Sequence, residues 1–336
     1  MKKFFFLAVA ATLTFAACNK TEVVYDDDPQ EIAMFAVNNL ATKAPVADAN
    51  FLEGDNMSVA AYLVSGDGAT PGNFFAQTAF NKNGNYWTGS KYWPISTATI
   101  SFLAITETGG GVDNSETTFN GNMASQATVS LSGNNVLDQN DLMYAAAQAT
   151  HEQGAAYAPV PMVFKHALSW INFSIRTNLA PGQVTVNSIA LNGACTDGTL
   201  TVTYNNYNEA GTPDLSTSWA KATKKGSPLY VPAAPDAQGV VNQAAAQVAK
   251  DGDYLPYGNG LLVVPGYSAD SFTINYTLKQ NDDVAQTFDY TYTFPTDLNW
   301  EMAHKYIYKI NITFTEIEID PEVEKWTDEG KPVTLK

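Results

Sequence analysis

Charged residues are scarce in this chain, and positive charge is the scarcest of all. Only 15% of the 336 residues are charged, and 18 Lys plus Arg stand against 34 Asp plus Glu, which gives a formal net charge of −16. Nucleic-acid binding needs a basic face that attracts phosphate, and this composition cannot supply one. Thr, Asn, Ser and Ala fill the polar and small positions instead, which favours an extracellular β-protein.

Cysteine and histidine are almost absent. Cys18 and Cys195 are the two cysteines, and His151, His166 and His304 are the three histidines. The sequence also lacks the Gly-x-Ser-x-Gly, Gly-x-Gly-x-x-Gly and Walker motifs, and it has no Cys or His pair at zinc spacing. Since a catalytic centre would have few general bases, we predict no enzymatic activity, no metal site and no cofactor. We interpret His166 as a structural residue that is hydrogen-bonded within a strand.

The chain begins with an export signal. A short basic start is followed by an apolar stretch from Phe4 to Ala11, which is too short to span a bilayer. Phe15-Ala16-Ala17-Cys18 then resembles a bacterial lipobox, in which the cysteine becomes the acylated first residue of a lipoprotein. We therefore predict a lipoprotein signal peptide at 1–17 and anchorage in outer-membrane lipid through Cys18. The alternative is an ordinary signal peptide that happens to contain a cysteine.

Alternation of apolar and polar residues runs through most of the chain after the signal. This period of two is typical of half-buried antiparallel strands, and turn-rich stretches separate them. A length of 336 residues, with 45% apolar and 12% aromatic residues, is enough for two separate cores. We therefore predict an all-β fold of two tandem antiparallel β-sandwich domains. The clearest strand candidates are 57–63, 200–204, 272–278, 288–294 and 306–314.

Less regular segments complete the predicted layout. Apolar residues fall on both faces from Met162 to Ile175, which predicts a central strand of a sandwich. Helical periodicity is best in Val240 to Lys250, and Asp138 to Gln148 has room for a helical turn or two. The turn-rich stretch from Asn205 to Gly211 predicts the boundary between the domains. The predicted segments are a tether and pro-segment at 18–43, an N-terminal sandwich at 44–204 and a C-terminal sandwich at 205–336.

A series of short landmarks is spread over nearly the whole chain. In this order they resemble the fimbrillin family, the structural subunits of type V pili made by anaerobic Bacteroides-group bacteria. Each landmark is weak alone, and their order is what carries the resemblance. After the lipobox they are Ile32 to Val37, Thr42-Lys43-Ala44, Phe51-x-x-Gly54-Asp55, Tyr92-Trp93-Pro94, Ile100 to Ala104, Asp141 to Ala145, Val163 to Leu168, Leu261 to Pro265, Tyr306 to Ile310 and Val323 to Trp326.

The resemblance implies a fold and an assembly route. The N-terminal sandwich would be transthyretin-like, and the precursor would be exported as a lipoprotein. A trypsin-like surface protease would then cut after a basic residue, and copies of the chain or related pilus subunits would join by donor-strand exchange into an adhesive surface fimbrium. Relatives often carry Arg at the cut, whereas the matching place here lies between Lys43 and Ala44.

Two segments are candidates for the exchanged strands. The strand that would be displaced is the segment from Glu31 to Val37, and its removal would leave unpaired backbone groups and uncovered core that another strand must fill. The tail from 317 to 335 is the candidate donor, and the alternative is that it is simply the last strand of the C-terminal sandwich. The predicted displaced residues are Ile32, Met34, Phe35 and Val37, and the predicted donor residues are Ile317, Ile319, Val323, Trp326, Val333 and Leu335.

Other functions stay open at this point. A permanently anchored surface lipoprotein that binds glycan or a host protein through its loops is the main alternative, and accessory tip or anchor subunits share the same architecture. A hydrolase acting through His166 and His304 is a third possibility. The predicted cut and tail favour a stalk subunit of the pilus.

Overall fold

The computed structural model contains β-strands throughout its described part and no helix there. The predicted all-β class is therefore confirmed, whereas the transthyretin-like topology of the N-terminal sandwich stays a prediction. None of the residues that the structure describes forms a helix long and apolar enough to cross a bilayer. The structure describes residues 30–37, 56–66, 70–107, 117–122, 126–131, 141–152, 158–180, 182–206, 214–221, 228–231, 243–244, 253–280 and 283–325.

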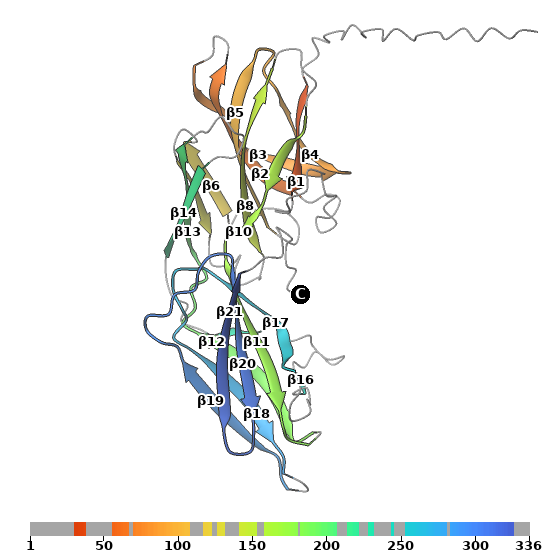
Figure 1. Ribbon diagram of the computed structural model, residues 1–336, viewed down its shortest axis with the longest axis vertical. Helices are drawn as coiled ribbons and strands as arrows, with labels where there is room; N and C mark the ends of the chain where they lie inside the picture. The colour runs from red at the N-terminus through yellow and green to blue at the C-terminus, as the bar shows by residue number, and fades with distance from the viewer. Residues whose placement is uncertain are drawn as a thin grey trace, which may run out of the picture.

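An eight-stranded sheet forms the upper part of the elongated molecule in Figure 1. β9 and β10 lie at opposite ends of this sheet, yet only Phe164 separates them in the sequence, so the sheet curves round on itself. In sheet order the strands are β10 (Lys165–His166), β8 (Leu142–His151), β5 (Ala98–Glu107), β2 (Asn56–Gly66), β3 (Gly72–Asn83), β4 (Tyr86–Tyr92), β1 (Glu31–Val37) and β9 (Val160–Val163).

A smaller sheet of four strands packs against the outside of the eight-stranded one. Leu200 and Val202 of this smaller sheet share a buried cluster with Leu103 and Tyr144, while the neighbouring residues Phe102 and Met143 point into the curved sheet's own core. Both faces of β5 and β8 are therefore covered. The four strands, in sheet order, are β14 (Asp214–Lys221), β13 (Gly198–Asn206), β7 (Gln126–Leu131) and β6 (Thr117–Asn122).

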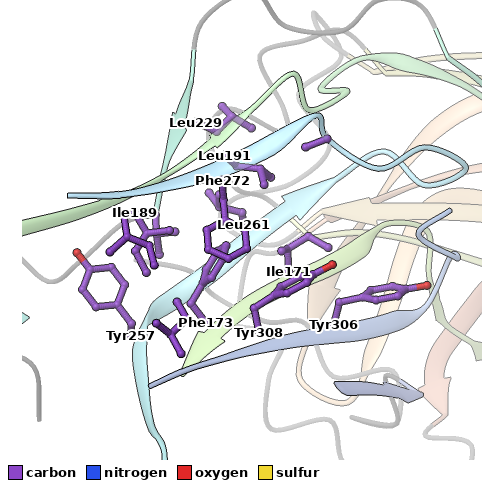
Figure 2. Close-up of a cluster of buried hydrophobic side chains, with 14 of the residues drawn as sticks. Ile171, Phe173, Ile189, Leu191, Leu229, Tyr257, Leu261, Phe272, Tyr306 and Tyr308 are labelled. Atoms are coloured by element: carbon purple, nitrogen blue, oxygen red, sulfur yellow. The ribbon is translucent and has the colours of Figure 1, made fainter. Parts of the chain in front are cut away.

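Two further sheets make the lower sandwich of Figure 1. Their facing sides supply an aromatic core in which the rings of Phe173, Phe272 and Tyr308 lie 5.1 to 5.9 Å apart, and Figure 2 shows these side chains between the strands. The first sheet has the order β17 (Leu255–Val263), β11 (Ser169–Thr177), β20 (His304–Ile312) and β21 (Ile317–Lys325); the second has β15 (Leu229–Tyr230), β12 (Val184–Asn192), β18 (Ser271–Leu278) and β19 (Gln286–Thr293), with β16 (Gln243–Ala244) also on β12.

The strand pairing does not follow the predicted break between residues 204 and 205. β11 and β12 lie before that point but pair with β20 and β18 of the lower sandwich. The chain then returns to the upper part, where β13 and β14 complete the four-stranded sheet. Residues 205 and 206 belong to β13, which pairs with the next strand β14, so the predicted boundary falls between two strands of one sheet.

Three local predictions were wrong. The stretch 162–175 forms parts of three strands, because its apolar run passes from the upper sheet into the lower sandwich. Within Asp138 to Gln148 the described residues from Leu142 onward belong to β8, where burial on both faces mimics a helical pattern. Of Val240 to Lys250, the described Gln243 and Ala244 form the short strand β16, and the rest of that segment lies outside the described residues. The five clear strand candidates are confirmed as β2, β13, β18, β19 and β20.

Candidate strand-exchange site

β1 is the first described strand, and it fills a slot between two other strands. It pairs antiparallel with β4, where Met34 lies opposite Trp87, and parallel with β9, where Met34 lies opposite Val160. In the sheet order β1 lies between β4 and β9, and these two strands do not pair with each other. Taking β1 out would therefore leave two facing strand edges with unpaired backbone groups.

The side chains of β1 alternate between the core and the outer face. Ile32 and Met34 are fully buried and Ala36 is 5% exposed, while Phe35 is only half-buried on the opposite face. The predicted displaced residues Ile32 and Met34 therefore point into the core, and Phe35 does not. Ala36 was not among the predicted displaced residues, although alternation counted from Ile32 predicts that Ala36 faces the core. Val37 is described only by its backbone pairing with Val163.

The pocket that receives these side chains is apolar. Ile32, Met34 and Ala36 pack within a cluster that is built from every large strand of the curved sheet. Burying Ile32 and Met34 contributes about 1.5–3 kcal/mol each, so β1 gains on the order of 3–6 kcal/mol from these two, with a smaller part from Ala36. The lining side chains include Met57, Phe80, Trp87, Trp93, Phe102, Met143, Val160 and Met162.

Polar contacts fix where β1 begins. The backbone N–H of Trp93 donates to the carbonyl of Gln30 over 2.9 Å, and the N–H of Ser90 donates to Oε1 of Glu31 over 2.8 Å. Ser90 has a positive φ of 52°, an uncommon backbone conformation for a residue other than glycine. These contacts hold the start of β1 in one register against β4, which is what a strand with only three inward side chains needs.

The described part of the candidate donor forms β21, the edge strand of the lower sandwich. It pairs antiparallel with β20, with Ile319 opposite Ile310 and Val323 opposite Tyr306. Ile317 and Ile319 are half-buried against the aromatic core, whereas Val323 is 56% exposed. β21 is thus held along one edge and covered only at its first residues.

One ion pair links β21 to its neighbour. Nζ of Lys309 lies 2.6 Å from Oε2 of Glu322, and this hydrogen bond raises the pKa of Lys309 above its ordinary value. The pair is solvent-exposed, so it contributes little to holding the strand. Nδ2 of Asn311 on β20 also donates to Oε2 of Glu318 over 2.9 Å, but this contact is exposed too, so β21 is weakly attached compared with β1.

Several predicted residues lie outside the described residues. These are Cys18, Lys43, Ala44, Trp326, Val333 and Leu335. Lys43 nonetheless lies in the stretch 38–55 that joins β1 to β2 along the chain, so a cut after Lys43 would separate β1 covalently from the rest of the sheet. Lipidation at Cys18 and cleavage after Lys43 stay predictions.

The histidines are built into the framework. Nδ1 of His166 lies 2.8 Å from Oδ2 of Asp141, with both side chains buried. His151 packs on Trp93, and burial lowers its pKa below the ordinary value of 6.5. His304 bonds through Nδ1 to the carbonyl of Met302. Within the described residues there is no group of three or more His, Cys, Asp or Glu side chains placed to hold a metal ion.

The amino-acid sequence matches the family model described as fimbrillin-like over residues 42–326. The chain belongs to the fimbrillin-like family. This match confirms the resemblance drawn from the landmarks. In a comparison with curated proteins, none matched this fimbrillin-like chain.

A solved structure of low identity shares the fold of this fimbrillin-like chain, and two further solved structures are similar to it over most of their length. A fimbrial protein from Bacteroides vulgatus is 17% identical, with 88% of this chain and 99% of that chain covered and a TM-score of 0.59. A candidate cell adhesion protein from Bacteroides uniformis is 17% identical, with coverage of 88% and 98% and a TM-score of 0.47. A fimbrial assembly protein from Parabacteroides distasonis is 12% identical, with coverage of 90% and 98% and a TM-score of 0.37.

Proposed function

We propose that this chain is a structural stalk subunit of a type V pilus that supports adhesion. The precursor is exported as a lipoprotein and held in the outer membrane through Cys18. A trypsin-like surface protease cuts between Lys43 and Ala44, and copies of the chain or related subunits then polymerise by donor-strand exchange. The observation that carries this proposal is the position of β1, which completes the curved sheet between β4 and β9 and precedes Lys43 by only a few residues.

Loss of β1 creates the acceptor. The vacant slot has a strand edge on each side and an apolar floor, so an incoming strand gains backbone hydrogen bonds from both edges and core contacts from alternate side chains. Because Ile32, Met34 and Ala36 are the inward side chains, the slot selects a donor with apolar residues at every second position. Isolated β4 and β9 edges would otherwise be a site of non-specific pairing.

The tail has the sequence pattern of a donor. Ile317 and Ile319 are two residues apart, and further apolar side chains follow towards the C-terminus at Val323, Val333 and Leu335. β21 is the outer strand of its own sheet and is only half-buried at its first residues. Removing β21 from its sheet therefore costs less free energy than removing a central strand would. We take residues 317–335 as the donor segment.

A pair of lysine variants tests the cut. Lys43→Ala should leave residues 18–43 attached and block filament growth, while Lys20→Ala, in the same tether, should assemble normally. N-terminal sequencing of native filaments should give a start at Ala44. Filaments whose peptides run unbroken from Ile32 through Ala44 would contradict strand exchange, and a surface-released form that keeps an acylated Cys18 would favour a permanently anchored adhesin or an anchor subunit.

A deletion tests the donor. Removal of residues 316–336 should give a secreted and folded monomer that still loses residues 18–43 but does not polymerise. Mixed with wild-type subunits, this monomer should accept a donor strand and then end the filament, because it has none to offer. Normal filament growth from the deletion alone would show that the donor lies elsewhere.

A further inference from the structure

β19 is an outer strand of the lower sandwich. It pairs with β18 along its whole length, from Ser271 opposite Thr293 to Leu278 opposite Gln286. Among the described residues no strand pairs with its other edge, and Figure 1 shows it along one side of the lower sandwich. Its eight residues are Gln286, Thr287, Phe288, Asp289, Tyr290, Thr291, Tyr292 and Thr293.

The outward face of β19 is a polar ladder that is already ordered. The hydroxyl groups of Thr291 and Thr273 lie 3.0 Å apart, as do those of Thr287 and Thr277. Between them Nδ2 of Asn275 donates to Oδ1 of Asp289 over 2.7 Å. These cross-strand bonds hold the edge in a regular geometry, so little side-chain freedom would be lost if another strand were added.

The opposite face of β19 is aromatic and incompletely covered. Phe288 is 40% exposed although its ring contacts Tyr276 with centroids 5.7 Å apart. Tyr290 and Tyr292 pack against the aromatic core but are only partly buried. Three large aromatic side chains therefore stand at a sheet edge with part of their apolar area in water, which is a common feature of surfaces that bind another protein.

The two outer strands on this side of the sandwich differ in how they are protected. β21 carries Pro321 and a row of acidic residues, which hinder the addition of another strand. β19 has no proline, no basic residue and a single acidic residue, Asp289. An edge that is long, regular and nearly uncharged pairs readily with another strand.

We propose that β19 pairs antiparallel with β19 of a second copy of this chain. The pairing places Tyr290 on the two-fold axis, Phe288 opposite Tyr292, Asp289 opposite Thr291 and Thr287 opposite Thr293. In this register the polar ladder and the aromatic face both continue from one copy into the other. The inference does not depend on strand exchange at β1.

Side-chain pattern, charge and length of overlap together select this register over its neighbours. A shift by one residue would bring polar side chains to the aromatic face. A shift that centres Asp289 on the axis would place the two carboxylates opposite each other. The opposite shift, centred on Thr291, would pair fewer residues of the strand.

Each copy carries a net charge of −16, so association should strengthen as salt screens the repulsion between copies.

Substitutions of Thr291 test the contact and its register together. Both Thr291→Asp and Thr291→Lys remove the same hydrogen bond to Thr273 and leave the core untouched, so they form a matched pair. In the dimer Thr291→Asp places two like-charge pairs across the joint, whereas Thr291→Lys places two opposite-charge pairs there. We expect the dissociation constant of Thr291→Asp to exceed that of Thr291→Lys by roughly tenfold or more.

The measurement is sedimentation equilibrium of the chain from Asn19 to Lys336, which retains every described residue, at low and high salt. Wild-type protein should dimerise more tightly in high salt, and at high salt, where the overall repulsion is screened, Glu324→Lys on β21 should leave its dissociation constant unchanged. Wild-type protein that stays monomeric in high salt at its highest soluble concentration would overturn the proposal. Equal dimerisation of the two Thr291 variants would overturn it as well.

Disulfide cross-linking tests the register directly. Opposite residues of an antiparallel pair lie about 5 Å apart at Cβ, within reach of a disulfide after a small adjustment. Asp289→Cys mixed with Thr291→Cys should therefore cross-link efficiently under oxidation, while either variant alone should cross-link several-fold less. Equal cross-linking in the mixture and in the single variants would refute the register.

Discussion

β1 and β21 lie near opposite ends of the chain, and they are held in opposite ways. β1 has a strand on each side and three side chains in the core, while β21 has one neighbour and only half-buried side chains. β1 carries one charged residue, whereas β21 carries acidic residues along its outward face. The difference suggests why a protein that exchanges strands would need a protease for β1: a strand this deeply buried does not leave unaided, but an edge strand can.

The largest expected effect is on β1. Met34→Ala should lower the free energy of unfolding of the precursor by about 2–5 kcal/mol, because it leaves a cavity in a tightly packed cluster. Urea unfolding followed by tryptophan fluorescence measures the loss, since Trp87 lies opposite Met34. Val323→Ala on β21 is the matched control and should change stability by less than about 0.5 kcal/mol. Equal losses for the two variants would remove the contrast between the strands.

Alkaline pH should weaken the sandwich that holds β21 more than the cluster around β1. Burial raises the pKa of Tyr257 to about 12 and raises the pKa of Tyr308 as well, while the β1 cluster contains no tyrosine. The folded state therefore keeps protons that the unfolded state loses above its pKa of about 10, so stability falls between about pH 10 and 12. Tyr257 alone should account for roughly 1–2 kcal/mol once solvent screening is allowed for.

The tyrosine contribution is measured by urea unfolding at pH 8, 10 and 11. Tyr257→Phe should reduce the slope of stability against pH, because it removes the titrating group. The Tyr257 hydroxyl is buried and makes no hydrogen bond with the described residues. Tyr257→Phe should therefore be at least as stable as wild type at pH 8, and a marked loss there would contradict this view of the site.

A smaller effect is expected where the first residues of β21 pack against the core. Ile319→Ala should cost about 1 kcal/mol, because the side chain is only half-buried. Hydrogen exchange should show faster opening of β21 and unchanged protection of β1. Protection that is lost in both strands together would mean that the two ends of the molecule unfold as one unit.

The smallest expected effect lies on the outer face of β21. Glu324→Lys should change the free energy of unfolding by no more than about 0.5 kcal/mol, because the side chain is exposed. Thermal unfolding measures it. A large stabilisation would show that repulsion among the acidic residues keeps β21 loosely attached, and it would make charge, and not shallow burial, the basis of the contrast with β1.

The sequence was most informative where alternation was clean. Period two predicted β18, β19 and β20, because one face of each strand is packed on the core while the other face is polar. The same rule applied to the segment from Glu31 to Val37 would have given Ala36 in place of Phe35. Alternation failed for β8, where both faces are buried and the pattern looks helical.

What the sequence determined by itself is the all-β class, the family and the strand at Glu31 to Val37, since alternation and ordered landmarks are local properties that can be read along the chain. Only the tertiary structure decided that β1 lies between β4 and β9, and that β11 and β12 belong to the lower sandwich and not to the upper sheet. Pairing joins residues that are far apart in sequence, and many partners satisfy the same alternating pattern. The choice among them is made by the packing of the whole core.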